Sequence, residues 1–360
     1  MRGLIGLVAI ALLAGCTSNA GDVESGLAVT VTNDGCSVSP ASAASGTVQF
    51  TVVNASDEVA AFAVRADDSR LGGIGNIAPG ITRAVLLDLA AGSYLAECTA
   101  GPTAPGITAS FSVTDSGVAA VPPPATDGVA ETYAAWVHDT SAELRDATGL
   151  LAAAFYSGEP GAQQLYREAR VLWASLRPVL SRFPELLPTI DARESDLVSG
   201  ERLSGWHAIE KDLWPPSGYR PLDAEARAEL GAELQTDLAE LLDRVEAAPA
   251  IDAVAIAAGA QDLVDAASRS LIDDDEHWSH AERWLVQGDL DGAEAAIDAL
   301  RPSLAENPLA EDVLAVIDER VEDLQDALDD DASTRELATR IDSLATALSL
   351  IAAETARIDP

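Results

Sequence analysis

The chain has few of the side chains on which most enzymes depend. Its 360 residues include four histidines, three cysteines and one methionine, and aromatic residues make up 4% of the sequence. The sequence contains no His-Glu-x-x-His zinc motif, no Gly-x-Ser-x-Gly nucleophile turn, no phosphate-binding loop and no dinucleotide fingerprint. These absences favour a binding role over catalysis.

Basic residues are also scarce, and lysine occurs once, at Lys211. The 22 basic residues face 59 acidic ones, which gives a formal charge of −37 at pH 7. Such a surface repels nucleic acid and anionic lipid, so we expect no nucleic-acid partner. It concentrates cations, although solvated acidic helix faces or adaptation to a salty habitat explain the same composition.

The N-terminus has the pattern of a bacterial lipoprotein signal peptide. Residues 1–15 combine an early positive charge with an apolar run from Leu4 to Ala14, and small residues precede Cys16. The apolar run is too short for a membrane-spanning helix. We therefore expect export, lipidation of Cys16 after cleavage, and a tether of residues 16–26 at the outer face of the cell membrane.

The other two cysteines, Cys36 and Cys98, form an even pair in an exported and oxidising setting. A disulfide between them is the default expectation. The alternative is a type 1 copper site, which needs two histidines beside the cysteine and usually an axial methionine. The first histidine is His138 and the only methionine is Met1, so we expect no type 1 copper in the N-terminal domain.

The hydrophobic periodicity changes along the chain, which indicates two domains. Residues 27–114 hold short alternating, β-branched runs between turn signals, the pattern of a small β-sandwich. Residues 115–128 predict a Pro-rich linker. Residues 129–360 follow helical periodicity and predict a bundle of about eight helices. The candidate helices lie near 129–157, 160–182, 189–213, 223–246, 250–271, 276–286, 289–304, 309–329 and 333–356.

The segment 205–214, Gly-Trp-His-Ala-Ile-Glu-Lys-Asp-Leu-Trp, contains the most informative pair of side chains, His207 and Glu210. At positions i and i+3 of a helix they share a face, and the apolar arc of that helix directs them toward a packed interior. An imidazole and a carboxylate at this spacing suit one borderline or hard transition metal. An interior hydrogen bond between the two side chains explains the spacing equally without a metal.

Several segments together resemble the EfeO proteins of bacterial iron uptake. Residues 205–214 resemble the family's His-x-x-Glu helix, 190–197 the acidic segment before it, and 273–293 a later segment that contains Ser-His. Residues 33–40 and 91–98 fall where the family has its two cysteines. The resemblance implies a multidomain β + α fold, with an N-terminal cupredoxin-like β-sandwich followed by an imelysin-like all-α helical bundle.

The resemblance also implies an iron site, or a site for another divalent metal, on Asp191, His207 and Glu210. The family has acidic residues just before a proline of the preceding helix, whereas this chain has Ala174 and Arg177 at those places. One expected carboxylate ligand is therefore missing, and a guanidinium is expected beside the site.

Two other residues are candidates for the missing ligand. Glu194 follows Asp191 by about one turn of a helix. His280 shares a face with Asp273 if a helix begins there, although the acidic run 273–276 is also an ordinary helix start.

The function that the resemblance implies is that of an exported, lipid-anchored, iron-binding component of an EfeUOB-like iron-uptake system. Such a component binds metal in its helical domain and passes it to a membrane permease, alongside a haem peroxidase. An imelysin-like metallopeptidase is the enzymatic alternative, and the lack of an evident third ligand and general base speaks against it. A structural or adhesion lipoprotein with a decayed site is the other alternative.

We predict that Cys16→Ser releases the protein from the membrane fraction, because the substitution removes the atom that receives the lipid. Fractionation of cells that produce the wild type, Cys16→Ser or the neighbouring control Ser18→Ala measures this. A Cys16→Ser variant that stays with the membrane as the control does would refute the lipoprotein interpretation.

Overall fold

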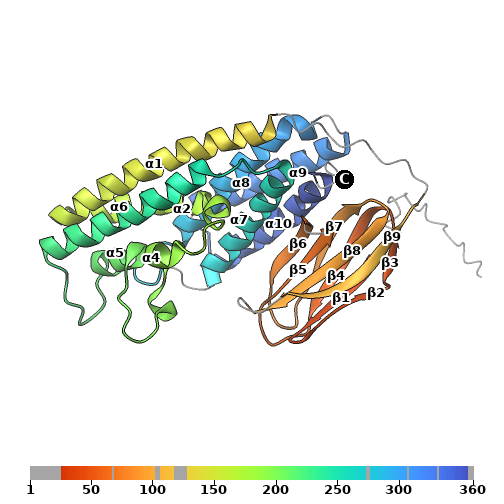
Figure 1. The fold of residues 1–360 in the computed structure, drawn as a ribbon, viewed down its shortest axis with the longest axis horizontal. Coiled ribbons are helices and arrows are strands. Elements are labelled where there is room, and N and C mark those ends of the chain that lie inside the picture. The colour runs from red at the N-terminus through yellow and green to blue at the C-terminus, as the bar shows by residue number, and fades with distance from the viewer. Residues whose placement is uncertain are drawn as a thin grey trace, which may run out of the picture.

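The computed structural model describes residues 26–66, 69–101, 106–116, 128–272, 276–305, 308–330 and 332–355. The expected signal peptide, the expected lipidation site Cys16 and most of the expected linker lie outside these residues. A strand region is followed along the chain by a helical region (Figure 1). The predicted order of a β-sandwich and an all-α domain is therefore confirmed.

The strands form two sheets that pack face to face. They are β1 (Gly26–Thr32), β2 (Gly35–Ser39), β3 (Ser42–Ala44), β4 (Gly46–Asn54), β5 (Ala60–Ala66), β6 (Ser69–Ile77), β7 (Thr82–Leu89), β8 (Gly92–Ala100) and β9 (Ile107–Thr114). One sheet has the order β2-β1-β4-β7, and the other has the order β3-β9-β8-β5-β6. Two of the pairings, β1 with β4 and β3 with β9, are parallel, and the others are antiparallel.

The alternating pattern of the strands puts one apolar row of each sheet into a shared core. Val29 and Val31 of β1 are completely buried, whereas their neighbours on the strand are partly or fully exposed. Phe50 of β4 meets Phe62 and Phe111 of the facing sheet, with ring centroids 5.2 and 5.5 Å apart. Side chains from both sheets thus interdigitate as in other aligned sandwiches.

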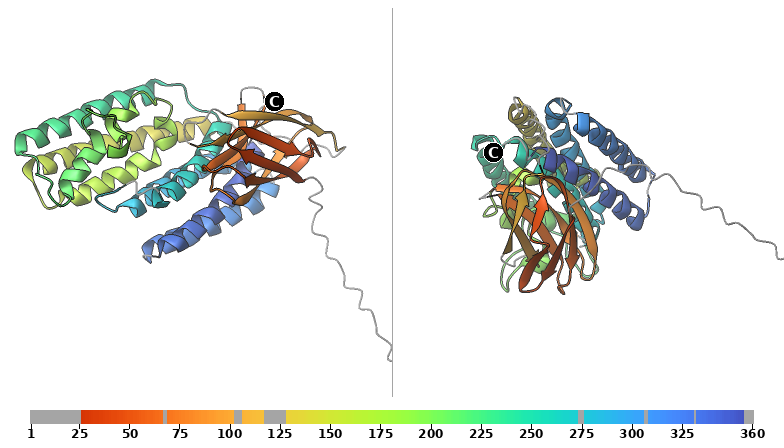
Figure 2. Two further views of the ribbon diagram at one scale, coloured as in Figure 1. Left: turned by 90° about the horizontal axis from the view of Figure 1, so that it is seen from below. Right: turned by 90° about the vertical axis from the view of Figure 1, so that its right-hand side faces the viewer.

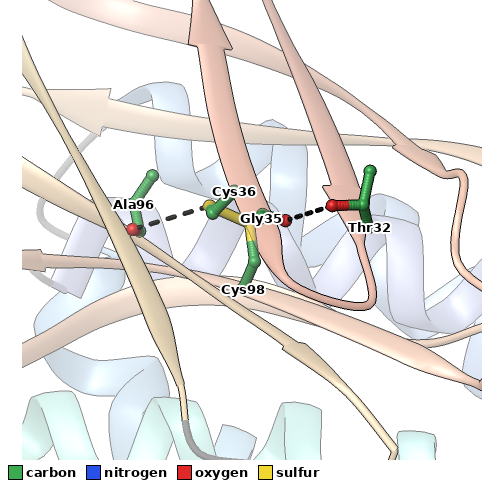
Figure 3. Close-up of a disulfide and its surroundings, with 5 residues drawn as sticks. All are labelled: Thr32, Gly35, Cys36, Ala96 and Cys98. Atoms are coloured by element: carbon green, nitrogen blue, oxygen red, sulfur yellow. Dashed lines mark hydrogen bonds between the residues drawn. A yellow bond between two sulfur atoms is a disulfide. The ribbon is translucent and has the colours of Figure 1, made fainter.

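The disulfide between Cys36 and Cys98 is present, which confirms the expectation from the cysteine count. It joins β2 of one sheet to β8 of the other, with the two Cα atoms 5.5 Å apart (Figure 3). The sulfur of Cys36 also lies 3.8 Å from the carbonyl oxygen of Ala96. The bond therefore ties the two sheets together beside the apolar core.

The helical part begins at residue 129. Its helices are α1 (Val129–Ser157), α2 (Ala162–Ser175), α3 (Arg177–Leu180), α4 (Leu187–Asp191), the short 3-10 helix η1 (Glu194–Asp196), α5 (Gly205–Leu213), α6 (Ala224–Ala247), α7 (Ala253–Ile272), α8 (Glu282–Leu304), α9 (Pro308–Asp329) and α10 (Thr334–Thr355). The bounds of α1 are those predicted from periodicity. Within the described ranges, no helix is long and apolar enough to cross a membrane.

The prediction of one helix over 189–213 is wrong. The chain leaves the helical conformation after Asp191 and re-enters it at Gly205, where α5 begins. Gly205 has φ +65°, and a Cβ at this position would collide with the backbone oxygen of Ile190. Because only glycine fits this conformation and this close approach, α5 folds back onto α4 instead of continuing from it.

Two other helix predictions are also wrong. The segment 160–182 is divided, because α2 ends at Ser175 and α3 begins at Arg177, directly before a proline. The predicted helices 276–286 and 289–304 are replaced by a turn at 276–279 and the single helix α8. His280 follows the turn with φ 51° and precedes α8, so it does not lie on a helix, and Asp273, with which it was expected to share a face, lies outside the described residues.

The β-sandwich packs against the helical domain through β6 and β7, which contact α7 and α10 (Figure 1). Polar contacts across this interface include Gly75 N–H to Asp265 at 3.2 Å, Arg70 to Asp262 at 3.1 Å and Arg83 to Asp342 at 3.2 Å. Helices α4 and α5 lie at the end of the helical domain away from the sandwich (Figure 1), and the same separation along the long axis is seen from below (Figure 2). The helices that carry the candidate site therefore lie apart from the sandwich.

We predict that the double substitution of Cys36 and Cys98 by serine destabilises the β-sandwich by about 4 kcal/mol, because the bond closes a loop with a sequence separation of 62. Calorimetric unfolding of the wild type and the variant measures this difference. Mass spectrometry of unreduced peptides is the control. Equal stability, or free thiols in the purified wild type, would contradict the prediction.

Candidate functional site

The fold brings the three predicted site residues together. Asp191 ends α4 and His207 lies in the first turn of α5, and the close packing of Gly205 on Ile190 sets these helices side by side. The distance from His207 Nε2 to Asp191 Oδ1 is 3.5 Å, and that from His207 Nδ1 to Glu210 Oε2 is 3.1 Å. His207 therefore lies between the two carboxylates.

The second oxygen of Glu210 is held by the turn before α8. Glu210 Oε1 accepts hydrogen bonds from the backbone N–H of Trp278 at 3.1 Å, and from the N–H and hydroxyl of Ser279, both at 2.8 Å. Burial alone raises the pKa of Glu210, but the hydrogen bonds from His207 and Ser279 outweigh burial and lower it. Glu210 is thus an ionised carboxylate inside the protein.

The state of Glu210 decides the tautomer of His207. An ionised carboxylate only accepts hydrogen bonds, so the Nδ1 of His207 carries the proton that Glu210 accepts. The other ring nitrogen, Nε2, lies on the Asp191 side of the imidazole, and it can bind a metal ion whenever the ring is neutral. An imidazole fixed by a carboxylate in this way is the usual arrangement of a metal-binding histidine.

Arg170 is the central cation of the cluster, and it was not among the predicted residues. It lies on α2 and is 1% exposed. Its Nη1 donates to Asp191 Oδ1 at 2.6 Å, and its Nε and Nη2 both lie 2.7 Å from Glu276 Oε1. Its guanidinium carbon lies 5.6 Å from the ring centroid of Trp206. The guanidinium therefore occupies the space between two carboxylates.

Glu276 is the second unpredicted residue of the cluster, and its side chain is fully buried. While Oε1 binds Arg170, Oε2 accepts a hydrogen bond from the hydroxyl of Tyr166 at 2.9 Å and lies 3.3 Å from the hydroxyl oxygen of Ser279. Ser279 thus bridges Glu276 and Glu210. A buried charge is costly unless it is paired and hydrogen-bonded, and these contacts meet that requirement.

Asp191 forms the solvent-facing edge of the cluster, with 25% of its side chain exposed. Its Oδ2 accepts a hydrogen bond from Trp173 Nε1 at 2.8 Å. Burial alone raises the pKa of Asp191. The charges of Arg170, His207 and Arg177 and the hydrogen bond from Trp173 outweigh burial and lower the pKa overall. The cluster holds three carboxylates and one guanidinium, two of the carboxylates in direct contact with it, so excess negative charge reaches solvent at Asp191.

The other candidate ligands lie elsewhere. Glu194 is exposed and pairs with Lys211 at 2.7 Å. His280 is exposed after the turn 276–279. Within the part of the chain that the structure describes, no group of three or more His, Cys, Asp and Glu side chains is arranged to hold a metal ion.

Ala174 and Arg177 contribute no ligand. Ala174 is fully buried and packs against Gly288 of α8. A Cβ added to Gly288 would lie 2.8 Å from the Cβ of Ala174. Arg177 pairs with the buried Asp289 at 2.9 Å. The sequence thus predicted a guanidinium beside the site, but Arg170 is the arginine that supplies it.

The sequence contains a signal for part of what was missed. Tyr166, Arg170 and Trp173 stand at positions i, i+4 and i+7 of α2 and so share one face. An arginine in an otherwise apolar stripe indicates a buried charge that needs partners. Glu276 has no such signal, because it ends an acidic run, 273–276, that is typical of a solvated helix start.

The comparisons with known proteins agree with this architecture. The imelysin family matches residues 129–358, and the chain belongs to this family. The chain is also similar to the proteins named iron uptake system component EfeO from Escherichia coli (strain K12) and Shigella flexneri. With each it is 26% identical over 314 residues, which cover 84% of this chain and 80% of the relative.

These findings confirm the resemblance to EfeO-type proteins that the sequence motifs indicated. These relatives are named as components of an iron-uptake system. This agrees with the expectation that the chain is not an enzyme.

We predict that acid destabilises the helical domain through Asp191 and Glu210, whose pKa values are lowered in the fold. A lowered pKa contributes stability above the unfolded value, near about 4, and this contribution is lost as the pH falls through the folded pKa. The double variant Asp191→Asn with Glu210→Gln should therefore show a shallower dependence of unfolding free energy on pH below about 4.

Denaturant unfolding followed by tryptophan fluorescence measures this dependence, because Trp173 and Trp206 both lie at the cluster. The exposed carboxylate Glu225 provides the matched control Glu225→Gln. A wild-type pH dependence in the double variant would contradict the prediction.

Proposed function

We propose that this protein is an exported, lipid-anchored component of an iron-uptake system whose iron site in the helical domain is formed by Asp191, His207 and Glu210, with Asp191 and His207 as the ligands and Glu210 as the support of His207. The observation that carries the proposal is the position of His207 Nε2, which lies 3.5 Å from Oδ1 of the partly exposed Asp191. The similarity to proteins named iron uptake system component supports iron as the cargo.

The distance between these two atoms suits a shared metal ion. Two bonds of about 2.1 Å that meet at about 110° separate their ligand atoms by roughly 3.4 Å. His207 Nε2 and Asp191 Oδ1 are 3.5 Å apart, so both can bind one ion without a large movement of α4 or α5. Because Asp191 is partly exposed, the ion reaches this position from solvent and water completes its coordination.

Glu210 has a different part in this proposal. Its Oε2 already accepts the His207 Nδ1 proton, and its Oε1 accepts three hydrogen bonds from Trp278 and Ser279. Glu210 therefore fixes the orientation of the imidazole and raises its basicity, as outer carboxylates do in many metal sites. Carboxylate oxygen and imidazole nitrogen suit iron, whereas copper(I) prefers sulfur ligands.

The transfer of iron follows from the same resemblance. A membrane permease is the proposed recipient, and a haem peroxidase is the proposed companion. The lipid anchor at Cys16 keeps the protein at the outer face of the cell membrane, where such a permease takes up its cargo.

The metallopeptidase alternative finds less support in this geometry. A metallopeptidase needs an open coordination position and a carboxylate that is free to act as general base. Glu210 has both oxygens engaged and is completely buried. The remaining carboxylate, Glu276, is paired with Arg170.

We predict that His207→Ala lowers the affinity for ferrous iron by more than about 100-fold, and that Glu210→Gln lowers it by about 10- to 100-fold, because the first removes a ligand and the second its support. Anaerobic titration calorimetry on the purified mature protein measures both. The exposed His138 of α1 provides the control His138→Ala, which should bind as the wild type does.

Two outcomes would contradict the proposal. Equal binding by the wild type and His207→Ala would refute the assigned site. No binding by the wild type would favour a structural lipoprotein whose metal site has decayed.

A further inference from the structure

Arg170 places a fixed positive charge next to the proposed iron position. Asp191 Oδ1 is 2.6 Å from Arg170 Nη1 and 3.5 Å from His207 Nε2. A metal bonded to this oxygen at about 2.1 Å thus lies less than about 5 Å from the guanidinium nitrogen. The two cations share one oxygen and repel each other.

The guanidinium is held in this place by more than Asp191. Glu276 binds it through two nitrogens, and Tyr166 and Ser279 in turn hold Glu276. The ring of Trp206 lies beside it, and 1% of Arg170 is exposed. Water therefore screens its charge little, and the charge stays near the iron position when Asp191 takes a second partner.

We propose that Arg170 is a specificity-determining residue whose charge makes the site favour divalent over trivalent metal ions. This inference rests on the iron binding proposed above. It assigns to Arg170 the choice between the two oxidation states of iron, whereas Asp191 and His207 bind either.

The charges of the cluster support this assignment. When a metal ion occupies Nε2 and the proton stays on Nδ1, the ring of His207 is neutral, and the cluster then counts three negative charges from Asp191, Glu210 and Glu276 and one positive charge from Arg170. A divalent ion therefore leaves the buried cluster neutral, whereas a trivalent ion leaves one uncompensated positive charge. Ferric iron carries one more unit of charge than ferrous iron. At an effective dielectric constant of about 20 and a distance of about 5 Å, the repulsion between this extra charge and Arg170 lowers the ratio of ferric to ferrous affinity by roughly a hundredfold.

The test is the reduction potential of bound iron in the purified mature protein, measured by spectroelectrochemistry. The potential reports the ratio of ferric to ferrous affinity, and a tenfold change in this ratio is about 59 mV. Arg170→Gln removes the charge and should raise the ratio at least tenfold, which lowers the potential by about 59 mV or more. Arg170→Lys keeps the charge and should restore most of the wild-type potential.

Arg227 provides the matched control. It pairs with the buried Asp212, on another face of α5, at 2.7 Å. Arg227→Gln thus breaks an ion pair of the same kind outside the cluster and should leave the potential unchanged. A structural disturbance of α5 alone would affect this variant as well.

A second variant keeps the inference testable if Arg170→Gln does not fold. Glu276→Gln removes a negative charge while Arg170 keeps its bond to Asp191 and its contact with Trp206, so the potential should rise. The role of Arg170 would be overturned if Arg170→Gln bound iron with an unchanged potential, or if Glu276→Gln lowered the potential. Either result would leave the proposed iron binding intact. Absence of iron binding by the wild type would overturn the proposed function together with this inference.

Discussion

The candidate site is organised around one buried interaction, the ion pairs of Arg170 with Asp191 and Glu276. A guanidinium that is 1% exposed persists inside a protein only with carboxylates in direct contact. Those carboxylates come from the end of α4 and from the turn before α8, so the pairing fixes both segments against α2. Glu210 and His207 are then oriented by groups that this pairing holds in place.

Near the cluster the helices are short or interrupted, and these breaks bring its side chains together. A single long helix over 189–213 would have carried Asp191 and His207 about four turns apart along one axis. The glycine conformation at Gly205 turns α5 back, and the two side chains come within 3.5 Å. The turn 276–279 interrupts the chain before α8 and presents backbone N–H groups to Glu210. Irregular backbone therefore builds the site, and regular helices support it.

The β-sandwich and the cluster are separate parts of the molecule. The sandwich is tied together by the Cys36–Cys98 bond and contacts α7 and α10 through polar pairs. Helices α4 and α5 lie away from that contact (Figures 1 and 2). The imelysin family covers the helical part, which also carries the whole cluster. The chemistry that we propose therefore belongs to the helical part.

The sequence by itself determined what depends on local spacing and on composition. His207 and Glu210 share a face because they are three residues apart on one helix, and the disulfide followed from an even pair of cysteines in a chain expected to be exported. The bounds of α1 followed from its periodicity. Only the tertiary structure decided the position of Arg170, which lies 106 residues from Glu276 along the chain. A buried ion pair of that sequence separation depends on how α2 packs against α4 and the turn before α8, and no local pattern records that packing.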